Sequence, residues 1–176
     1  MCGIVGYKSK INARLQGALT DSLKTLSKRG PDNQSSYFSN SVGLGHTRLS
    51  ILDISSNAHQ PMSDPSRRYT IVFNGEIYNY LELKQSLAHT EFRSTSDTEV
   101  LLHLLIEKGT DCLKDLNGFF SLAFYDNEKD KLILARDRMG IKPLHYYQDE
   151  DQLYFASEMK ALLCLPFERS INHQSL

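Results

Sequence analysis

The sequence has few cysteines and no close cysteine pair. Its three cysteines are Cys2, Cys112 and Cys164, and an odd number without a CxxC spacing is a poor basis for a disulfide framework. Its six histidines also lack the short spacings that are typical of zinc ligands. We therefore expect a reduced compartment and no metal site.

The sequence also lacks long apolar runs and an excess of charge of either sign. Apolar runs such as residues 104–106 are far shorter than the roughly 18 residues that a membrane helix needs. Lys8 and Lys10 interrupt any secretory signal core. The chain has 20 Lys and Arg against 21 Asp and Glu, and no basic stripe interleaved with aromatic residues. We therefore expect no membrane or nucleic-acid partner and a cytoplasmic location.

The composition is that of one globular domain. The chain has 176 residues, of which 40% are hydrophobic and 23% charged, so intrinsic disorder does not fit. A chain of this length can bury about 70% of its unfolded surface. We expect a single domain over residues 1–176.

Hydrophobic periodicity predicts strands, then helices, then strands. Helical spacing covers residues 13–28, 80–88, a segment from Ser96 to the stop at Gly109, and 158–164. Strand patterns cover residues 2–7, 36–38, 42–49, 69–73, 119–125, 131–135, 143–147 and 152–156. We expect the last four strands to form a meander. This order favours an α+β fold with antiparallel sheets covered by helices.

Cys2 follows the initiator methionine, and removal of Met1 would make it the amino-terminal residue. A thiol and a free α-amine would then belong to one residue. The amine has an ordinary pKa of about 7.7–8.0, so near neutral pH part of it can accept the thiol proton. A cysteine at the second position can also be an accident of the translation start, and the dipeptide alone does not decide between the two interpretations.

Asn74 and Gly75 lie between apolar residues, and this pair has two interpretations. An Asn-Gly pair in such a setting is a strong β-hairpin signal. Alternatively, the Asn74 amide and the Gly75 N–H could form an oxyanion hole, because glycine lets the backbone approach a ligand closely.

Three charged residues could bind the two ends of an amino acid. Arg48 interrupts an apolar strand, where it needs either an internal carboxylate or the carboxylate of a ligand. Asp97 follows Ser96 at a predicted helix start, where the helix dipole alone favours a carboxylate. Its alternative role is to receive a ligand ammonium group, with Glu76 as a further acceptor.

Other polar residues have simpler interpretations. His46 is interpreted as a hydrogen-bonded strand histidine rather than a base for the cysteine, and Cys112 and Cys164 as packing residues. The charged loops at residues 29–32 and 136–140 are interpreted as mainly architectural.

Short motifs along almost the whole chain resemble those of class II glutamine amidotransferases. These are MCGI at residues 1–4, RGPD at 29–32, HTRLSI at 46–51, NGEIYN at 74–79 and SDTE at 96–99. Later motifs resemble the glutaminase half of asparagine synthetase: LNG at 116–118, RD at 136–137, GIKPL at 140–144 and SEMKAL at 157–162.

The resemblance implies an N-terminal-nucleophile fold, a four-layer αββα sandwich with two stacked antiparallel sheets between helices. It also implies roles for individual residues. These are the nucleophile Cys2, the oxyanion-hole pair Asn74 and Gly75, the carboxylate ligand Arg48, the ammonium ligands Asp97 and Glu76, and the pocket residues Leu49 and Ile51.

The implied reaction is hydrolysis of L-glutamine to L-glutamate and ammonia, with no cofactor in this domain. The resemblance implies that the ammonia passes to a synthetase domain or subunit, with aspartate as its acceptor. ATP and magnesium are expected only in that carboxy-terminal synthetase domain, for which no pyrophosphate-loop motif is present, so we favour an excised domain. Two other interpretations stay open: a glutamine-binding or assembly module without catalysis, and a purely structural α+β domain.

Overall fold

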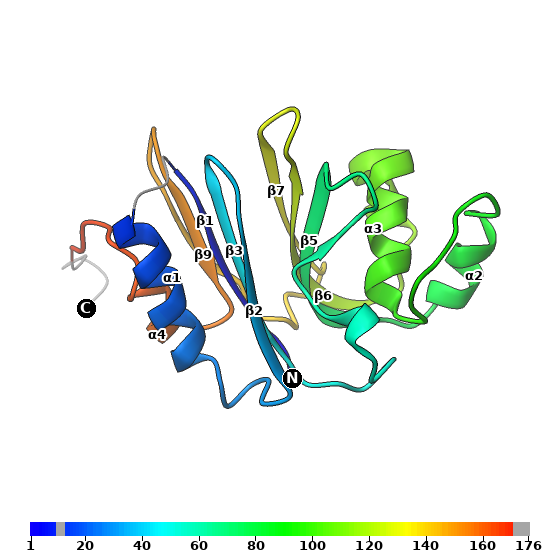
Figure 1. Cartoon of the computed structure of the whole chain (residues 1–176), viewed down its shortest axis with the longest axis horizontal. Helices are drawn as coiled ribbons and strands as arrows, with labels where there is room; N and C mark the ends of the chain where they lie inside the picture. The colour runs from blue at the N-terminus through cyan, green and yellow to red at the C-terminus, as the bar shows by residue number, and fades with distance from the viewer. Residues whose placement is uncertain (10–12, 171–176) are drawn as a thin grey trace.

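The computed structural model describes residues 1–9 and 13–170 (Figure 1). The predicted domain span, 1–176, includes residues 10–12 and 171–176, which lie outside the described residues. Two antiparallel sheets pack face to face, with helices covering the outer face of each sheet. The α+β prediction and the four-layer αββα arrangement are therefore confirmed.

The first sheet has the amino-terminal strand at its centre. Its spatial order is β2 (Asn33–Phe38), β3 (Val42–Arg48), β1 (Gly3–Lys8), β9 (Leu153–Ala156) and β8 (His145–Gln148). The helices α1 (Ala13–Thr25) and α4 (Met159–Leu162) cover its outer face. Leucines at helical spacing form this layer, because Leu19 and Leu23 of α1, and Leu26 just after it, pack in one buried cluster with Val5 and Tyr7 of β1.

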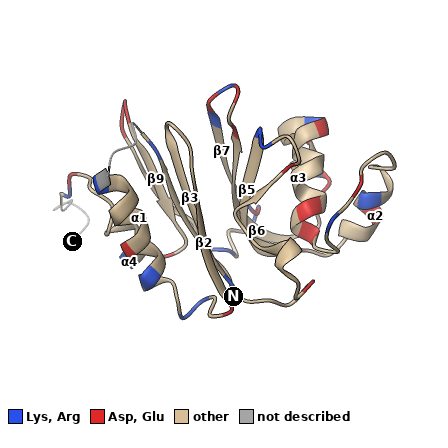
Figure 2. Cartoon of the chain, in the orientation of Figure 1, with Lys and Arg blue, Asp and Glu red and all other residues tan. Residues whose placement is uncertain are grey.

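The second sheet is formed by β4 (Met62–Ser63), β5 (Tyr69–Ile77), β6 (Gly118–Asp126) and β7 (Lys131–Arg136), in that order. Its outer layer contains α2 (Tyr80–Gln85) and α3 (Asp97–Lys108). Two short 3₁₀ segments are η1 (Ser56–Ala58) and η2 (Gly109–Lys114). Figure 2 shows that charged residues lie mainly on helices and loop ends, whereas the strands carry few.

Strand alternation determines which side chains of β5 enter the space between the sheets. Ile71 and Phe73 pack in the cluster that contains the buried leucines of α3, whereas Val72 packs in the cluster shared with the first sheet. Because successive side chains point to opposite faces, Asn74 and Glu76 share the inner face with Val72. These two polar residues therefore point into the space between the sheets.

The same alternation aligns the amino terminus with this space. Ile4 of β1 is buried in the inter-sheet cluster with Val72 and Leu44, so Cys2, two residues earlier, lies on the same face. Cys2, Asn74 and Glu76 therefore lie together at the end of this space where β1 begins.

Most predicted elements are confirmed with shifted ends, but two expectations are wrong. The last four strands do not form a meander, because β6 and β7 pair in one sheet while β8 and β9 pair in the other. Residues 137–144 carry the chain across: Asp137 accepts from the backbone N–H groups of Ile141 and Lys142, and Gly140 has a positive φ of 64°. Pro143, which lacks an N–H group, precedes β8.

The hairpin interpretation of Asn74 and Gly75 is also wrong, because both lie inside β5 in register with Ser121 and Phe120 of β6. The helix start at Ser96 is confirmed, since its side chain accepts a hydrogen bond from the Glu99 N–H at 3.3 Å. Among the described residues, no helix has the length and hydropathy to cross a membrane.

Candidate active site at Cys2

Cys2 directly precedes the central strand β1. Its carbonyl accepts a hydrogen bond from Arg29 Nε at 2.8 Å, and Arg29 also pairs with Glu158 at 3.0 Å. Two residues further, the Ile4 N–H donates to Ser157 Oγ at 2.9 Å. The backbone of Cys2 is therefore connected to segments from both ends of the chain, which is the rigid support that a reactive group needs.

The Cys2 thiol contacts the backbone of Leu49. The Leu49 N–H donates to Sγ at 3.5 Å, and the Leu49 oxygen lies 3.7 Å from the same sulfur. Burial raises the pKa of the thiol, while the Leu49 hydrogen bond and the charges of the amino terminus, Arg48 and Lys142 act in the opposite direction. The thiol is consequently sensitive to the cations around it.

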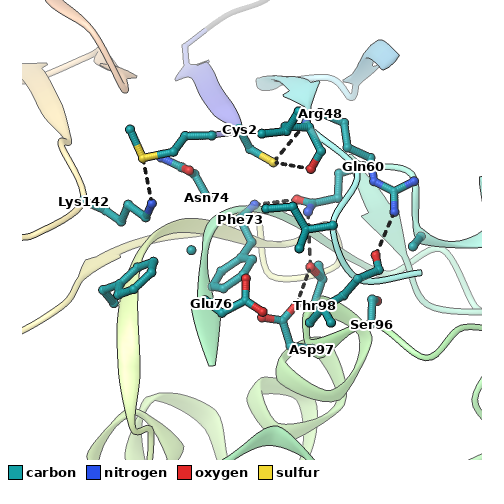
Figure 3. Close-up of a pocket in the computed structure, with 17 residues that line it drawn as sticks. Cys2, Arg48, Gln60, Phe73, Asn74, Glu76, Ser96, Asp97, Thr98 and Lys142 are labelled. Carbon is teal, nitrogen blue, oxygen red and sulfur yellow. Dashed lines mark hydrogen bonds between the residues drawn. The ribbon is translucent and has the colours of Figure 1, made fainter. Parts of the chain in front are cut away.

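A cavity of about 230 Å³ opens beside this thiol (Figure 3). All eight residues singled out from the sequence line it: Cys2, Arg48, Leu49, Ile51, Asn74, Gly75, Glu76 and Asp97. Lys142 and Arg48 lie on opposite sides of Cys2 in Figure 3, and Glu76 and Asp97 lie together at the other end. The cavity thus has cations near the thiol and carboxylates away from it.

Asn74 offers an unused donor to the cavity. The residue is only 1% exposed, and its Nδ2 has no hydrogen-bond partner within the described part of the chain. A buried amide donor without a partner costs free energy, so this arrangement indicates a ligand oxygen as the missing acceptor.

The Gly75 N–H points sideways from β5, away from β6, in the same direction as the N–H groups of Phe73 and Ile77. The Phe73 N–H donates to Gln60 Oε1 at 2.6 Å, and the Ile77 N–H donates to Asp97 Oδ2 at 3.0 Å. Backbone N–H groups two residues apart point the same way along a strand, so the Gly75 N–H lies between these two. A Cβ on Gly75 would lie 2.4 Å from the Phe119 oxygen, so sheet packing also requires glycine here.

His46 connects the two sheets behind Asn74. Its Nε2 lies 3.1 Å from the Phe73 oxygen, and because a carbonyl only accepts, this ring nitrogen donates. Complete burial lowers the pKa of His46 to about 3. The interpretation as a hydrogen-bonded strand histidine is confirmed, and a ring that is already a neutral donor is a poor base for Cys2.

Asp97 and Glu76 form the acidic end of the cavity. Burial raises the pKa of Asp97 to about 6, against the opposing hydrogen bond from Ile77 N–H, and the Glu76 charge adds to the rise. Burial also raises the pKa of Glu76, which Lys142 partly offsets. Each carboxylate would be stabilised by a cationic ligand group.

Arg48 is buried, and its guanidinium donates to three backbone oxygens, those of Leu52, Asp53 and Ser55. Within the described residues it forms no ion pair with a carboxylate. The internal-carboxylate interpretation is therefore wrong for these residues. A guanidinium has five N–H donors, so two remain for a ligand.

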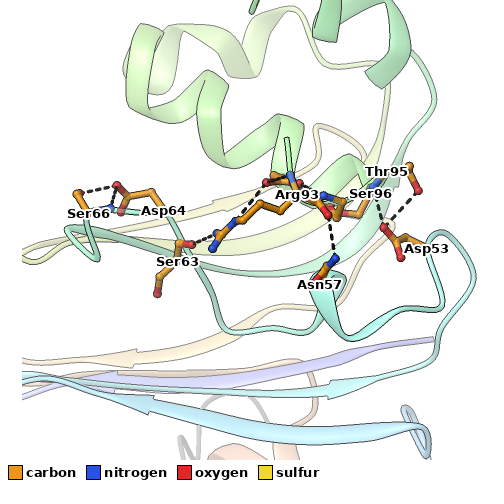
Figure 4. Close-up of polar contacts among 10 residues, drawn as sticks. Asp53, Asn57, Ser63, Asp64, Ser66, Arg93, Thr95 and Ser96 are labelled. Carbon is orange, nitrogen blue, oxygen red and sulfur yellow. Dashed lines mark hydrogen bonds and ion pairs between the residues drawn. The ribbon is translucent and has the colours of Figure 1, made fainter. Parts of the chain in front are cut away.

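The loop held by Arg48 is also attached to the start of α3 (Figure 4). The Thr95 N–H donates to Asp53 Oδ2 at 2.7 Å, and Asn57 Nδ2 donates to the Arg93 oxygen at 3.0 Å. The buried Glu99 carboxylate accepts from the Arg93 N–H at 3.0 Å. These contacts keep one wall of the cavity against the helix that carries Asp97.

Sequence reasoning missed two residues that matter to the site. Gln60 bridges β5 and α3 because its Nε2 donates to Thr98 Oγ1 at 3.2 Å while its Oε1 accepts from Phe73. Lys142 enters the cavity although it belongs to a loop interpreted only as a family motif. The GIKPL motif was the available signal for Lys142, but a loop sequence does not predict where a long side chain ends.

The two stacked antiparallel sheets between helices form the N-terminal-nucleophile fold, with a cavity at the start of the central strand β1. A solved glutamine phosphoribosylpyrophosphate amidotransferase from Bacillus subtilis, complexed with ADP and GMP, is similar to this chain with a TM-score of 0.77. The match has 21% identity and covers 93% of this chain and 43% of that chain. At this identity the likeness establishes the fold alone.

The chain belongs to the glutamine amidotransferase domain family, whose model matches residues 1–176. It is 43% identical over 170 residues to an asparagine synthetase [glutamine-hydrolyzing] 2 of Bacillus subtilis, covering 94% of this chain and 23% of that protein. It is 41% identical over 167 residues to asparagine synthetase B [glutamine-hydrolyzing] of Escherichia coli, covering 93% of this chain and 30% of that protein. The chain therefore spans about a quarter to a third of the length of these relatives.

Proposed function

We propose that this chain is a single glutaminase domain that hydrolyses L-glutamine to L-glutamate and ammonia, with Cys2 as the nucleophile after removal of Met1. One observation carries the proposal: a single cavity holds the Cys2 thiol, the unpartnered Asn74 amide and the carboxylates of Asp97 and Glu76. Family membership over residues 1–176 supports it.

Removal of Met1 converts the Cys2 amide nitrogen into an amine. This amine has an ordinary pKa of about 7.7–8.0, so it accepts the thiol proton near neutral pH. Sγ then attacks the side-chain carbonyl carbon of glutamine, which forms the S–C bond and places a negative charge on the oxygen. Asn74 Nδ2 and the Gly75 N–H donate to this oxyanion.

Collapse of the tetrahedral intermediate breaks the C–N bond. The α-ammonium group returns its proton to the leaving nitrogen, so ammonia departs and a γ-glutamyl thioester remains on Cys2. The amine then takes a proton from a water molecule that attacks the thioester. Cleavage of the S–C bond releases glutamate and restores the thiol, and the reaction balances without a cofactor.

The α-amino and α-carboxylate groups of glutamine bind at the charged parts of the cavity. Asp97 and Glu76 receive the ammonium group, and the two free N–H groups of Arg48 receive the carboxylate. Leu49 and Ile51 line the wall beside them. Binding of an ammonium group favours the ionised form of Asp97, whose pKa is otherwise raised by burial.

The ammonia acceptor belongs to a separate synthetase domain or subunit. The named activity of the two curated relatives is glutamine-hydrolysing asparagine synthesis, so we propose aspartate as the acceptor. ATP and magnesium would be used there and not in this half-reaction.

Glutamate release from glutamine tests the function. The processed chain, identified by its intact mass, should release glutamate and ammonia in equal amounts, and Cys2→Ala should reduce this to the uncatalysed rate. Cys164→Ala is the matched control and should retain the activity. Equal rates for wild type and Cys2→Ala would refute the proposal, and glutamine binding without turnover would support a non-catalytic binding module instead.

A further inference from the structure

Lys142 is a buried cation inside the cavity, and within the described residues its ammonium group forms no ion pair. It is 6% exposed, and its Nζ lies 4.5 Å from the centre of the Phe119 ring. In residues 1–9 and 13–170, no carboxylate oxygen lies within 4.0 Å of this nitrogen. A buried ammonium group without an anionic partner costs free energy of folding, so stability alone does not explain it.

The loop fixes both backbone polar groups of Lys142. Its N–H donates to Asp137 Oδ2 at 3.0 Å, and its carbonyl accepts from Arg136 Nε. Asp137 Oδ1 accepts from the Ile141 N–H at 2.9 Å. The backbone therefore has little freedom to withdraw this side chain from the cavity.

The hydrogen-bond partner of the ammonium group is a residue that the proposed function removes. Lys142 Nζ donates to Met1 Sδ at 3.1 Å. Figure 3 shows this contact beside the Cys2 thiol. Loss of Met1 would free the donor in the cavity that Cys2 also lines.

We propose that Lys142 is a positioning residue for the glutaminase reaction, and that its ammonium group favours the thiolate form of Cys2 in the processed chain. The inference rests on the proposed function, because it concerns the same thiol. Arg48 approaches Cys2 from the opposite side, but three of its donors are held by loop carbonyls. Lys142 is the cation near the thiol whose donors become free on processing.

Other charged groups near Cys2 also affect the stability of its thiolate. The carboxylates of Glu76 and Asp97 share the cavity and oppose a thiolate, whereas Arg29 donates to the Cys2 carbonyl and is paired with Glu158. Burial lowers the pKa of Lys142, with the Arg29 charge as a further cause, whereas Cys2, Glu76 and Asp137 act against it. A thiolate and this ammonium group therefore stabilise each other.

The pH dependence of Cys2 alkylation tests the inference without requiring turnover. Processed wild type, Lys142→Met, Lys142→Arg and the distant control Lys24→Met would be treated with iodoacetamide, and the Cys2 peptide would be quantified by mass spectrometry. A cation within about 4–6 Å of an acidic group lowers the pKa of that group by about 1–3. We expect Lys142→Met to shift the midpoint upward by about one pH unit, and Lys142→Arg and Lys24→Met to leave it near the wild-type value.

An unchanged midpoint in Lys142→Met would overturn the inference, even if the wild-type chain hydrolyses glutamine. A shifted midpoint in a chain that releases no glutamate would support the inference and refute the proposed function. If Lys142→Met fails to fold, Lys142→Gln replaces it under the same criterion, with thermal unfolding of each variant as the folding check.

Discussion

Within the described residues, the Asn74 Nδ2 donor has no hydrogen-bond partner, which leaves it available to a ligand oxygen. Asn74→Ala removes this donor from the side chain while leaving the β5 backbone in place. Loss of one oxyanion-hole donor costs about 10²–10³ in kcat, and we expect that decrease with a small change in KM, because the donor acts mainly on the transition state.

Steady-state glutamate release checks this expectation. Asn40→Ala is the matched control, since Asn40 is exposed in the turn between β2 and β3, and it should retain the wild-type rate. A rise in KM at unchanged kcat would assign Asn74 to ground-state binding instead.

We expect the buried Asp97 carboxylate to lower the stability of the fold at neutral pH and to favour binding of the ligand ammonium group. Its folded-state pKa of about 6 lies above its ordinary value of 3.8, so its contribution to stability is greatest below pH 3.8 and is lost as pH rises through about 6. Asp97→Asn has no such loss. At pH 7.5 without glutamine, we expect this variant to be more stable than wild type by roughly 1–3 kcal/mol and to bind glutamine more weakly.

Denaturant unfolding at several pH values, with calorimetry for glutamine, measures both parts of this prediction. Asp111→Asn is the control, because its hydrogen bond to Lys114 lowers the pKa of that exposed carboxyl, and it should gain no stability at pH 7.5. An Asp97→Asn variant that is less stable than wild type at every pH would contradict the account.

The positions of the candidate site residues were predictable where those residues lie in or next to a strand or helix. Cys2, Asn74 and Glu76 follow from strand alternation once the two sheets face each other, and Asp97 follows from the helix start at Ser96. Lys142 was not predictable, because a hydrogen-bonded loop determines where its long side chain ends.

At the scale of elements, the close approach of β5 and β6 determines the shape of the cavity wall. Gly75→Ala would place a Cβ 2.4 Å from the Phe119 oxygen and 2.8 Å from the Phe120 Cα. The two strands would have to separate, so we expect a loss of about 1–3 kcal/mol in the free energy of unfolding, together with reduced glutaminase activity.

Gly17→Ala is the matched control on α1. A Cβ on Gly17 would have no neighbour within 4 Å, and replacing a helical glycine with alanine stabilises by about 0.5–1 kcal/mol. Chemical denaturation of both variants compares the two effects. Equal stability of Gly75→Ala and wild type would mean that the strand contact is not tight.

Element types were predictable from periodicity, but strand partners were not. The Asn-Gly pair has the composition of a hairpin turn, yet register with Ser121 and Phe120 extends β5 through it. Similarly, the spacing of the last four strands fits a meander, but β8 does not pair with β7. It pairs with β9, which pairs in turn with β1 at the other end of the chain. Local patterns do not encode such long-range pairings, which packing decides.

At the scale of the whole molecule, the site depends on how the two stacked sheets are placed relative to each other, and a buried hydrogen bond connects them. His46 donates across the inter-sheet space to the Phe73 oxygen. Its folded-state pKa of about 3 lies below its ordinary value of 6.5, so its contribution to stability is complete above pH 6.5 and is lost as pH falls toward 3. At pH 5 we expect it to account for a loss of roughly 2 kcal/mol.

Unfolding of wild type and His46→Gln between pH 4.5 and 7.5 isolates this contribution, because Asp97 titrates in both proteins. The stability of wild type should fall more steeply on acidification than that of the variant. Parallel curves for the two proteins would show that His46 is not the group that destabilises the fold in acid.

The central claim is that the free amino-terminal Cys2 performs the chemistry. The most direct measurement compares glutamate release by two forms of the same chain, one processed and one with Met1 retained by inhibiting methionine aminopeptidase during expression, each confirmed by intact mass. The account predicts turnover by the processed form and none above the uncatalysed rate by the form that keeps Met1, since its Cys2 has no amine and Met1 lines the cavity. Equal turnover by the two forms would contradict it.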